Sequence, residues 1–280
     1  MAYDKVVDSA ALDAALTDIA DAIRTKTGKT DPLTIEQMPS EIEGISGGGG
    51  GSVYENLKYS NRATFTNVNV PELGDTFEVT MPLNQTDFSS VFGRDSKFKH
   101  FIVHSNARPT SMLSMFKFAN NGRVYTVTLD FDTSKVTTYR DCFAMGVGAY
   151  GANFTTINGV IDFTSVTQAN ALAGMFVYTT QLQDVTFAAN TLSLSLNVTY
   201  LSNINDNSLL SLINCLKDRT GENALTLTVA SAWKTADTGR LYVSYVKLDA
   251  DTGLYVLCEQ TDEGATTMAD AITSKNWTIA

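Results

Sequence analysis

Hydrophobic and polar residues alternate in short runs through the middle of the chain, and each run leads into a turn and then a phenylalanine. In the clearest copy, residues 124–143, an alternating run is followed by Asp-Thr-Ser-Lys-Val-Thr and ends on Phe143. A second copy spans 160–176, and weaker copies lie at 110–116 and 89–92. Alternation with a period of two is typical of a strand with one buried face. The phenylalanines that end the copies lie 24, 27 and 33 residues apart: Phe92, Phe116, Phe143 and Phe176. Repetition at this period predicts a stacked solenoid, with Phe116, Phe143 and Phe176 in its core.

The same alternation predicts where the strands of this solenoid lie. Two runs, 63–70 and 76–81, are expected to form a sheet that covers the open apolar end, because terminal repeats need a polar outer face. The repeat strands are expected at 98–103, 124–129, 153–162 and 182–187, with shorter alternation around Leu192, Leu194 and Leu196.

The C-terminal quarter changes from repeats to mixed elements. Residues 206–220 carry a helical stripe that Asp206 or Asn207 is expected to cap and Gly221 to end. Alternating runs predict an antiparallel hairpin from 241–248 and 254–259, joined by a turn. The remaining elements are a strand at 225–229, a short helix at 267–274 and a final strand at 276–279.

The first 46 residues predict two short amphipathic helices. Because two such helices bury little apolar surface by themselves, their stripes need a partner, either further copies of the chain or a docking protein. Five glycines and a serine at 47–52 predict a flexible linker. The stripe residues assigned to oligomerisation or anchoring are Leu12, Leu16, Ile19, Ile23, Ile35, Met38 and Ile42.

These elements together predict an α+β chain. A helical hairpin at 1–46 and a glycine linker at 47–52 precede an irregular β-solenoid body at 53–205, and a capping helix and hairpin follow at 206–280.

The segment from Leu16 to Ile45 contains Ala-Asp-Ala-Ile-Arg-Thr-Lys-Thr-Gly and then Asp-Pro-Leu-Thr. It resembles a short module of tail and baseplate proteins from phages and prophages of Gram-positive gut bacteria. The resemblance covers 30 of the 280 residues. It implies attachment to other tail or baseplate proteins, and a homo-oligomer, with a trimer favoured by the class.

Two further segments carry resemblances. The repeat unit Leu-Asp-Phe-Asp-Thr-Ser-Lys-Val-Thr resembles the atypical leucine-rich repeats of bacterial surface proteins. Thr220-Gly221 with the following Leu-Thr-Leu-Thr, and the terminal Lys275 and Trp277-Thr-Ile-Ala, are similar to the end of phage tail proteins that carry such repeats. The hairpin at 241–259 departs from that pattern as an insertion. These resemblances imply a virion location, after synthesis in the bacterial cytoplasm.

Composition narrows the partners. Twenty basic and 30 acidic residues give a net charge of −10, which disfavours nucleic acid and anionic membranes. The N-terminal residues lack the basic and apolar regions of a signal peptide, and no run of about 18 apolar residues is present. The widely spaced Cys142, Cys215 and Cys258 are expected to pack as small apolar residues rather than to form disulfides or a zinc site.

Several residue patterns could carry chemistry. Gly-Val-Gly-Ala-Tyr-Gly at 146–151 fits a dinucleotide fingerprint, but without a strand before it and a helix after it we interpret it as a loop. His100 and His104 share a strand face too far apart for one metal ion, and surface positions are expected for both. Carboxylates recur near strand ends, where turn capping is favoured over a calcium site or glycoside hydrolysis: Asp130, Asp132, Asp162 and Asp184. We therefore predict no catalytic, cofactor or metal site.

Aromatic residues are the remaining binding signal. Tyr beside Asn, Thr and Ser binds sugars and proteins without charge, although packing between repeats is the simpler explanation for any one of them. The candidate receptor contacts are Tyr139, Tyr150, Tyr178 and Tyr200. The expected function is a non-enzymatic phage tail or baseplate protein that displays a surface for a host glycan or protein. The alternatives are a purely structural tail component, a bacterial surface adhesin and, last, a glycan depolymerase.

Overall fold

The computed structural model describes two units separately, Met1–Asn56 and Leu57–Ala280. The described residues are 13, 16–21, 23, 24, 32, 34, 37, 75–81, 86–92, 99–117, 124–146, 153–235 and 238–280.

The first unit contains the predicted first helix. The backbone is helical at residue 13, at 16–21 and at 23–24. Ile23 is buried at 3% exposure, whereas Ile19 is 46% exposed and Leu16 half-buried. The three described stripe residues thus differ in exposure: one is buried, one half-buried and one exposed. The other stripe residues and the glycine linker lie outside the described residues: Leu12, Ile35, Met38, Ile42 and 47–52.

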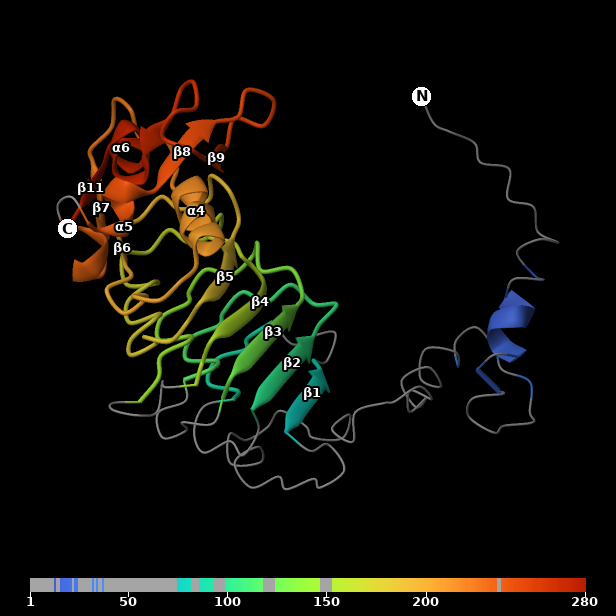
Figure 1. Cartoon of the computed structure of the whole chain (residues 1–280). Coiled ribbons are helices and arrows are strands. Elements are labelled where there is room, and N and C mark those ends of the chain that lie inside the picture. Colours follow the sequence, from blue (N-terminus) through green and yellow to red (C-terminus); the bar gives the residue numbers. More distant parts are fainter. Residues whose placement is uncertain are drawn as a thin grey trace. The chain divides into compact units, whose positions relative to one another are not determined.

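The second unit is built on a parallel β-solenoid of about three turns, residues 76–187. Five strands lie side by side in chain order (Figure 1), and all their pairings are parallel. They are β1 (Thr76–Thr80), β2 (His100–His104), β3 (Thr126–Asp130), β4 (Thr156–Ile161) and β5 (Asp184–Phe187). The segment at 76–81 was expected in a separate capping sheet, and that expectation is wrong. It forms β1 instead, because Phe77 and Val79 align with Phe101 and Val103 of β2.

Behind the sheet, the predicted phenylalanines form one continuous stack. Phe92 and Phe116 lie 5.3 Å apart between ring centroids, Phe116 and Phe143 5.7 Å, and Phe143 and Phe176 5.9 Å. The rings are within 18° of parallel, and all four are buried. Main-chain hydrogen bonds join the same turns, since the amides of Phe92, Phe116 and Phe143 donate to residues 115, 142 and 175. Offset stacking and burial thus reinforce one register along the solenoid.

Each phenylalanine is preceded, two residues earlier, by a residue in the left-handed backbone region. These residues are Ser90, Ser114, Asp141 and Gly174, with φ values of 57°, 53°, 54° and 69°. The conformation costs most residues free energy, and only glycine adopts it without strain. The fourth copy needs glycine for a second reason, because a Cβ on Gly174 would lie 2.2 Å from Asp141 Oδ1.

The turns that follow the strands are capped by aspartate. Asp87, Asp132 and Asp162 each accept a hydrogen bond from the amide two residues later, at 2.9, 2.8 and 2.7 Å. This Asx-turn geometry provides an acceptor that the backbone of a tight turn lacks. Turn capping was the favoured interpretation for Asp130, Asp132, Asp162 and Asp184, and only Asp132 and Asp162 show that geometry. Asp130 contacts His104 of the neighbouring strand, and Asp184 accepts from Asn205 before α4.

Helix α4 (Asp206–Cys215) covers the last edge of the sheet (Figure 1). Ser208 Oγ accepts a hydrogen bond from the buried amide of Val185 at 2.9 Å, and Ser211 Oγ from the amide of Phe187 at 2.7 Å. A bare parallel edge would expose these amides, so the two serines end the solenoid. The helix cap is Asn205, not Asp206 or Asn207 as expected, and the helix ends at residue 215, before Gly221.

Beyond α4 the chain forms two small sheets. A parallel sheet has the order β11–β7–β6, and an antiparallel sheet has the order β10–β8–β9. The predicted hairpin is present, but 241–243 belong to a short helix rather than to its first strand. The elements are β6 (Leu196–Asn197), β7 (Leu225–Thr228), a 3-10 turn η3 (Ser231–Trp233), α5 (Arg240–Val243), β8 (Tyr245–Leu248), β9 (Tyr255–Cys258), β10 (Thr266–Thr267), α6 (Met268–Ser274) and β11 (Trp277–Ile279).

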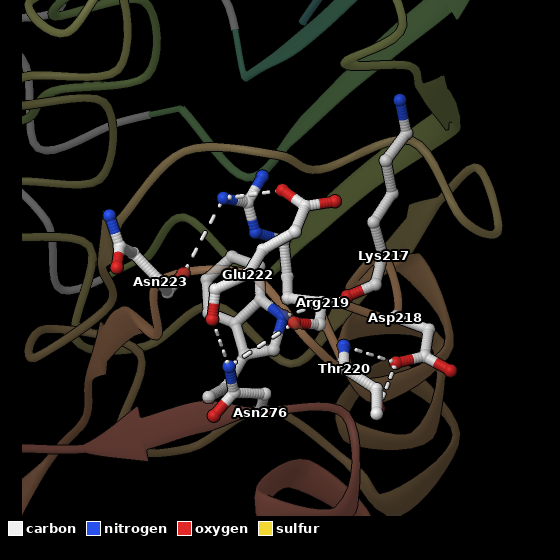
Figure 2. A network of polar contacts seen from close by, with 8 residues as sticks. Lys217, Asp218, Arg219, Thr220, Glu222, Asn223 and Asn276 are labelled. Carbon is white, nitrogen blue, oxygen red and sulfur yellow. Dashed lines mark hydrogen bonds and ion pairs between the residues drawn. The ribbon is translucent and has the colours of Figure 1, made fainter.

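The segment around Thr220-Gly221 and the terminal segment 275–280 meet in one polar network. The side-chain amide of Asn276 donates to the carbonyls of Arg219 and Glu222 at 3.2 and 2.7 Å (Figure 2). Trp277 Nε1 donates to the carbonyl of Lys217 at 2.9 Å. Lys275 Nζ donates to the carbonyls of residues 213 and 216, at the C-terminal end of α4. The terminal residues therefore hold the chain that leaves α4, since a helix end has unsatisfied carbonyls.

The burial of the cysteines and the lengths of the helices test two expectations from the sequence. Cys142 and Cys215 are fully buried, as predicted, and burial raises the pKa of both thiols. Among the residues that the structure describes, no helix is both long and apolar enough to span a bilayer.

Candidate ligand-binding face

The outward side chains of the solenoid sheet form rows across the strands. On β2, Phe101 and Val103 are buried, while His100, Ile102 and His104 point to the opposite face. Side chains alternate along a strand, and the parallel register carries that alternation from strand to strand. One row is Thr76, His100, Thr126, Thr156 and Asp184; the next is Glu78, Ile102, Thr128 and Asn158. This sheet face is polar and at least partly exposed at every described position.

His104 lies between two carboxylates from neighbouring strands. Its Nδ1 is 2.6 Å from Asp130 Oδ2 on β3, and its Nε2 is 2.7 Å from Glu78 Oε1 on β1. Partial burial lowers the pKa of His104, but the hydrogen bonds and charges of Asp130 and Glu78 outweigh it, so the net pKa is raised. Protonated His104 can donate to both carboxylates at once, which neutral imidazole cannot.

A hollow of about 550 Å³ opens beside His104, in the size range of ligand pockets. Its lining includes Asn106, Asp130 and Phe131 from the β2 and β3 turns, with Val160 from β4. Val160 is 47% exposed, which is unusual for an apolar residue within a sheet.

Gly159 shapes this hollow. The pairing of β4 with β5 is interrupted between Thr156 and Val160 by a bulge, and Gly159 within it has a φ of +100°. A Cβ at this position would lie 2.4 Å from the carbonyl oxygen of Leu129. Glycine is therefore required both for the backbone conformation and for the close approach of β3, and the bulge turns Val160 outward.

A second hollow of about 230 Å³ adjoins the first, because Gly159 lines both. Its walls are Asn158 on β4, Asp184 and Thr186 on β5, and Asn205 and Asn207 at the start of α4. Asn205 caps the helix and also donates to Asp184. The capping helix thus adds amide groups to the end of the sheet face.

The charges of the two hollows are mainly negative. Asp132 is engaged by Arg108 Nε at 2.8 Å and by the amide of Ser134, and the Ser134 hydrogen bonds hold the pKa of Asp132 below its ordinary value. Asp130 and Asp184 contribute further carboxylates. No group of three His, Cys, Asp or Glu within the described ranges is arranged to hold a metal ion.

The surroundings of His104 do not match a serine–histidine pair for nucleophilic catalysis. Both of its ring nitrogens already contact carboxylates, so neither is available to take a proton from a serine. The hollows offer carboxylate acceptors and side-chain amides on the outer face of the sheet.

No family model, curated protein or solved structure matches this chain.

The predicted tyrosine contacts lie in different environments. Tyr139 is fully buried, and its hydroxyl donates to the carbonyl of Asp162 at 2.9 Å. The expectation that Tyr139 reaches the surface is wrong, because its ring packs between repeat turns and meets Phe163 edge-on. Tyr178 and Tyr200 are half-buried and form an edge-to-face pair with ring centroids 5.0 Å apart. Tyr150 lies outside the described residues.

Sequence reasoning missed the two hollows. His104 and Asp130 were considered separately, as a surface histidine and a turn carboxylate, yet they are paired neighbours in the sheet. An available signal was Gly159, since an isolated glycine within a strand pattern indicates a bulge or a close backbone approach. The contribution of Asn205 and Asn207 had no sequence signal, because it depends on how α4 docks.

Proposed function

We propose that this chain is a non-enzymatic structural protein of a phage tail or baseplate that presents its solenoid body to the host cell surface. The open sheet face with its two adjoining hollows is the observation that carries the display role. A polar, concave surface on a stacked scaffold is suited to holding a ligand without transforming it.

The assignment to a tail rests on the resemblance of Leu16 to Ile45 to phage attachment modules. The helical backbone at 16–21 is compatible with it, because the resemblance places an amphipathic helix there. In this proposal the first unit joins other tail proteins and associates with copies of itself, most simply as a trimer.

The finer assignment of the body to irregular leucine-rich repeats belongs to the same proposal. Two features support it. One is the aspartate-capped turn that follows both β3 and β4, and the other is the left-handed residue two positions before each stacked ring, which recurs with the phenylalanine spacing.

Deletion of residues 1–46 tests the attachment role. Virions assembled with the shortened chain should lack it in immunogold images, while full-length chain with the same tag should label the tail. Tails that carry the shortened chain at the full-length level would refute attachment through this segment.

Binding of the full chain to host cells tests display against a purely structural role. Saturable binding to cells of the phage's own host, and none to non-host cells, is expected. Absence of saturable binding would favour the structural alternative. Release of reducing sugar from host envelopes would instead indicate a depolymerase, and would contradict the non-enzymatic proposal.

A further inference from the structure

The two hollows form one continuous surface, which we call the polar strip: Asn106, Asp130, Asn158, Val160, Asp184, Thr186 and Asn207. Its members come from the turn after β2, from three strands and from the first turn of α4. Because Gly159 joins the hollows, a ligand longer than one hollow can lie across the strands.

Hydrogen-bonding capacity along the polar strip is only partly used. Asp130 engages His104 through Oδ2, and Asp184 engages Asn205 through Oδ1. The second oxygen of each carboxylate makes no hydrogen bond with the described residues. Asn158 donates to Thr128 through Nδ2, and its carbonyl oxygen makes no hydrogen bond with the described residues. In a buried sheet such oxygens form hydrogen bonds within the protein, whereas these oxygens lie on an open face of the sheet.

The chemistry of these groups favours hydroxyl-rich ligands. Carboxylate and amide oxygens accept hydrogen bonds from hydroxyls, and side-chain amides also donate to them. Val160 supplies an exposed apolar contact in the middle of the polar groups, suited to the C–H face of a sugar ring. Polar side chains line both hollows, so a wholly apolar ligand would leave their hydrogen-bonding groups unpaired.

Charge selects among glycans. Three aspartates line the hollows: Asp130 lies against His104 and Asp132 against Arg108, whereas Asp184 has no cationic partner among the described residues. A phosphate or carboxylate polymer would meet like charge, while an ammonium group would meet unlike charge.

From these observations we infer that the polar strip binds a neutral or amine-bearing glycan of the host envelope. This inference rests on the proposed display function and specifies the ligand of that surface.

A matched pair of arginine substitutions tests the site in the full chain. Thr186→Arg places a long cation in the second hollow, where Thr186 is exposed. Thr167→Arg makes the same chemical change at an exposed threonine that lines neither hollow. Equal far-UV circular dichroism and melting temperature would show that both variants fold.

The binding probe is an array of bacterial polysaccharides in three classes: neutral, amine-bearing, and acidic with phosphate or carboxylate groups. The unchanged chain should bind at least one neutral or amine-bearing glycan. Thr186→Arg should lower that affinity at least tenfold, and Thr167→Arg should leave it within twofold. Signal confined to acidic glycans, no signal above background, or equal loss in both variants would overturn the inference.

A second matched pair of substitutions tests the role of charge in binding. Asp184→Asn should weaken binding of an amine-bearing glycan severalfold, whereas Asp251→Asn removes an exposed carboxylate from a distant turn and should not. Equal affinities for the two variants would refute the role of charge at Asp184.

Periodate or protease treatment of host cells tests the glycan inference separately from the display function. Periodate, which cleaves vicinal diols, should abolish binding of the full chain, and protease treatment of the cells should not. Protease-sensitive, periodate-resistant binding would refute the glycan inference and leave display intact. Glycan binding on the array by a chain that is absent from tails and does not bind cells would refute display and leave the glycan site intact.

Discussion

The stacked phenylalanines make a quantitative prediction about stability. Phe143 is completely buried, and its ring lies between Phe116 at 5.7 Å and Phe176 at 5.9 Å, nearly parallel to both. Phe143→Ala removes both stacking contacts and leaves a cavity that the rigid turns on either side cannot close. We expect a loss of about 4 kcal/mol in the free energy of unfolding, within the usual range for a buried phenylalanine.

A conservative variant separates the loss of unfolding free energy due to lost volume from that due to lost stacking. Phe143→Leu keeps most of the apolar volume but loses the aromatic contacts, so a smaller loss of about 1–2 kcal/mol is expected. Leu248→Ala provides a surface control, because Leu248 is 59% exposed and its truncation should change stability by less than about 0.5 kcal/mol.

Urea denaturation of the full chain with two probes provides the assay. Far-UV circular dichroism follows the solenoid, while fluorescence follows Trp233 and Trp277, which are both buried in the C-terminal region. Because Ser208 and Ser211 join α4 to the last strand, both probes should shift together in Phe143→Ala.

Two results would refute this reasoning. Equal losses of unfolding free energy in Phe143→Ala and Phe143→Leu would show that the cavity and the packed stack do not set the stability. Alternatively, circular dichroism could shift while tryptophan fluorescence does not, and the C-terminal region would then unfold independently of the solenoid.

Three further predictions concern the sheet, the turns and the capping helix. The pKa of His104 is raised in the folded chain, so its contribution to folding stability is fully present below the unfolded pKa and is lost as pH rises through the folded pKa. The urea midpoint should therefore fall between about pH 6 and pH 8, and His104→Gln should reduce this pH dependence. Ser114 and Gly174 both have positive φ, so Ser114→Gly should stabilise the chain by up to about 1 kcal/mol, and Gly174→Ala, which adds a Cβ, should destabilise it by about 1–3 kcal/mol. Melting temperatures of the two variants that shift in the same direction would contradict this. Ser208→Ala should cost about 1–3 kcal/mol by leaving the buried amide of Val185 without an acceptor, and that amide should exchange faster with deuterium.

Much of the solenoid could be predicted from the sequence, because its signals are local. Alternation fixes which side chains face the core, and the Asp-x-Ser and Asp-x-Thr turns cap themselves within three residues. The spacing of Phe116, Phe143 and Phe176 indicated a stack, because each turn of a solenoid repeats its neighbour's contacts.

Other elements depended on contacts that a local pattern does not contain. The segment at 76–81 has the alternation of any strand, and only its register with β2 makes it the first strand of the main sheet. Residues 241–243 alternate like a strand but form part of α5, where Leu241 is buried. Tyr139 has the composition of a surface contact, yet the neighbouring turn covers it.

The sequence alone determined the repeat, its strand faces and its closing phenylalanines, because these follow from periods of two residues and of one turn. The polar strip was decided by tertiary structure. Its members lie between residues 106 and 207 of the chain, and only parallel register, the Gly159 bulge and the docking of α4 bring them to one surface. Lateral register couples residues more than 20 positions apart, and no local period encodes which outward side chains become neighbours.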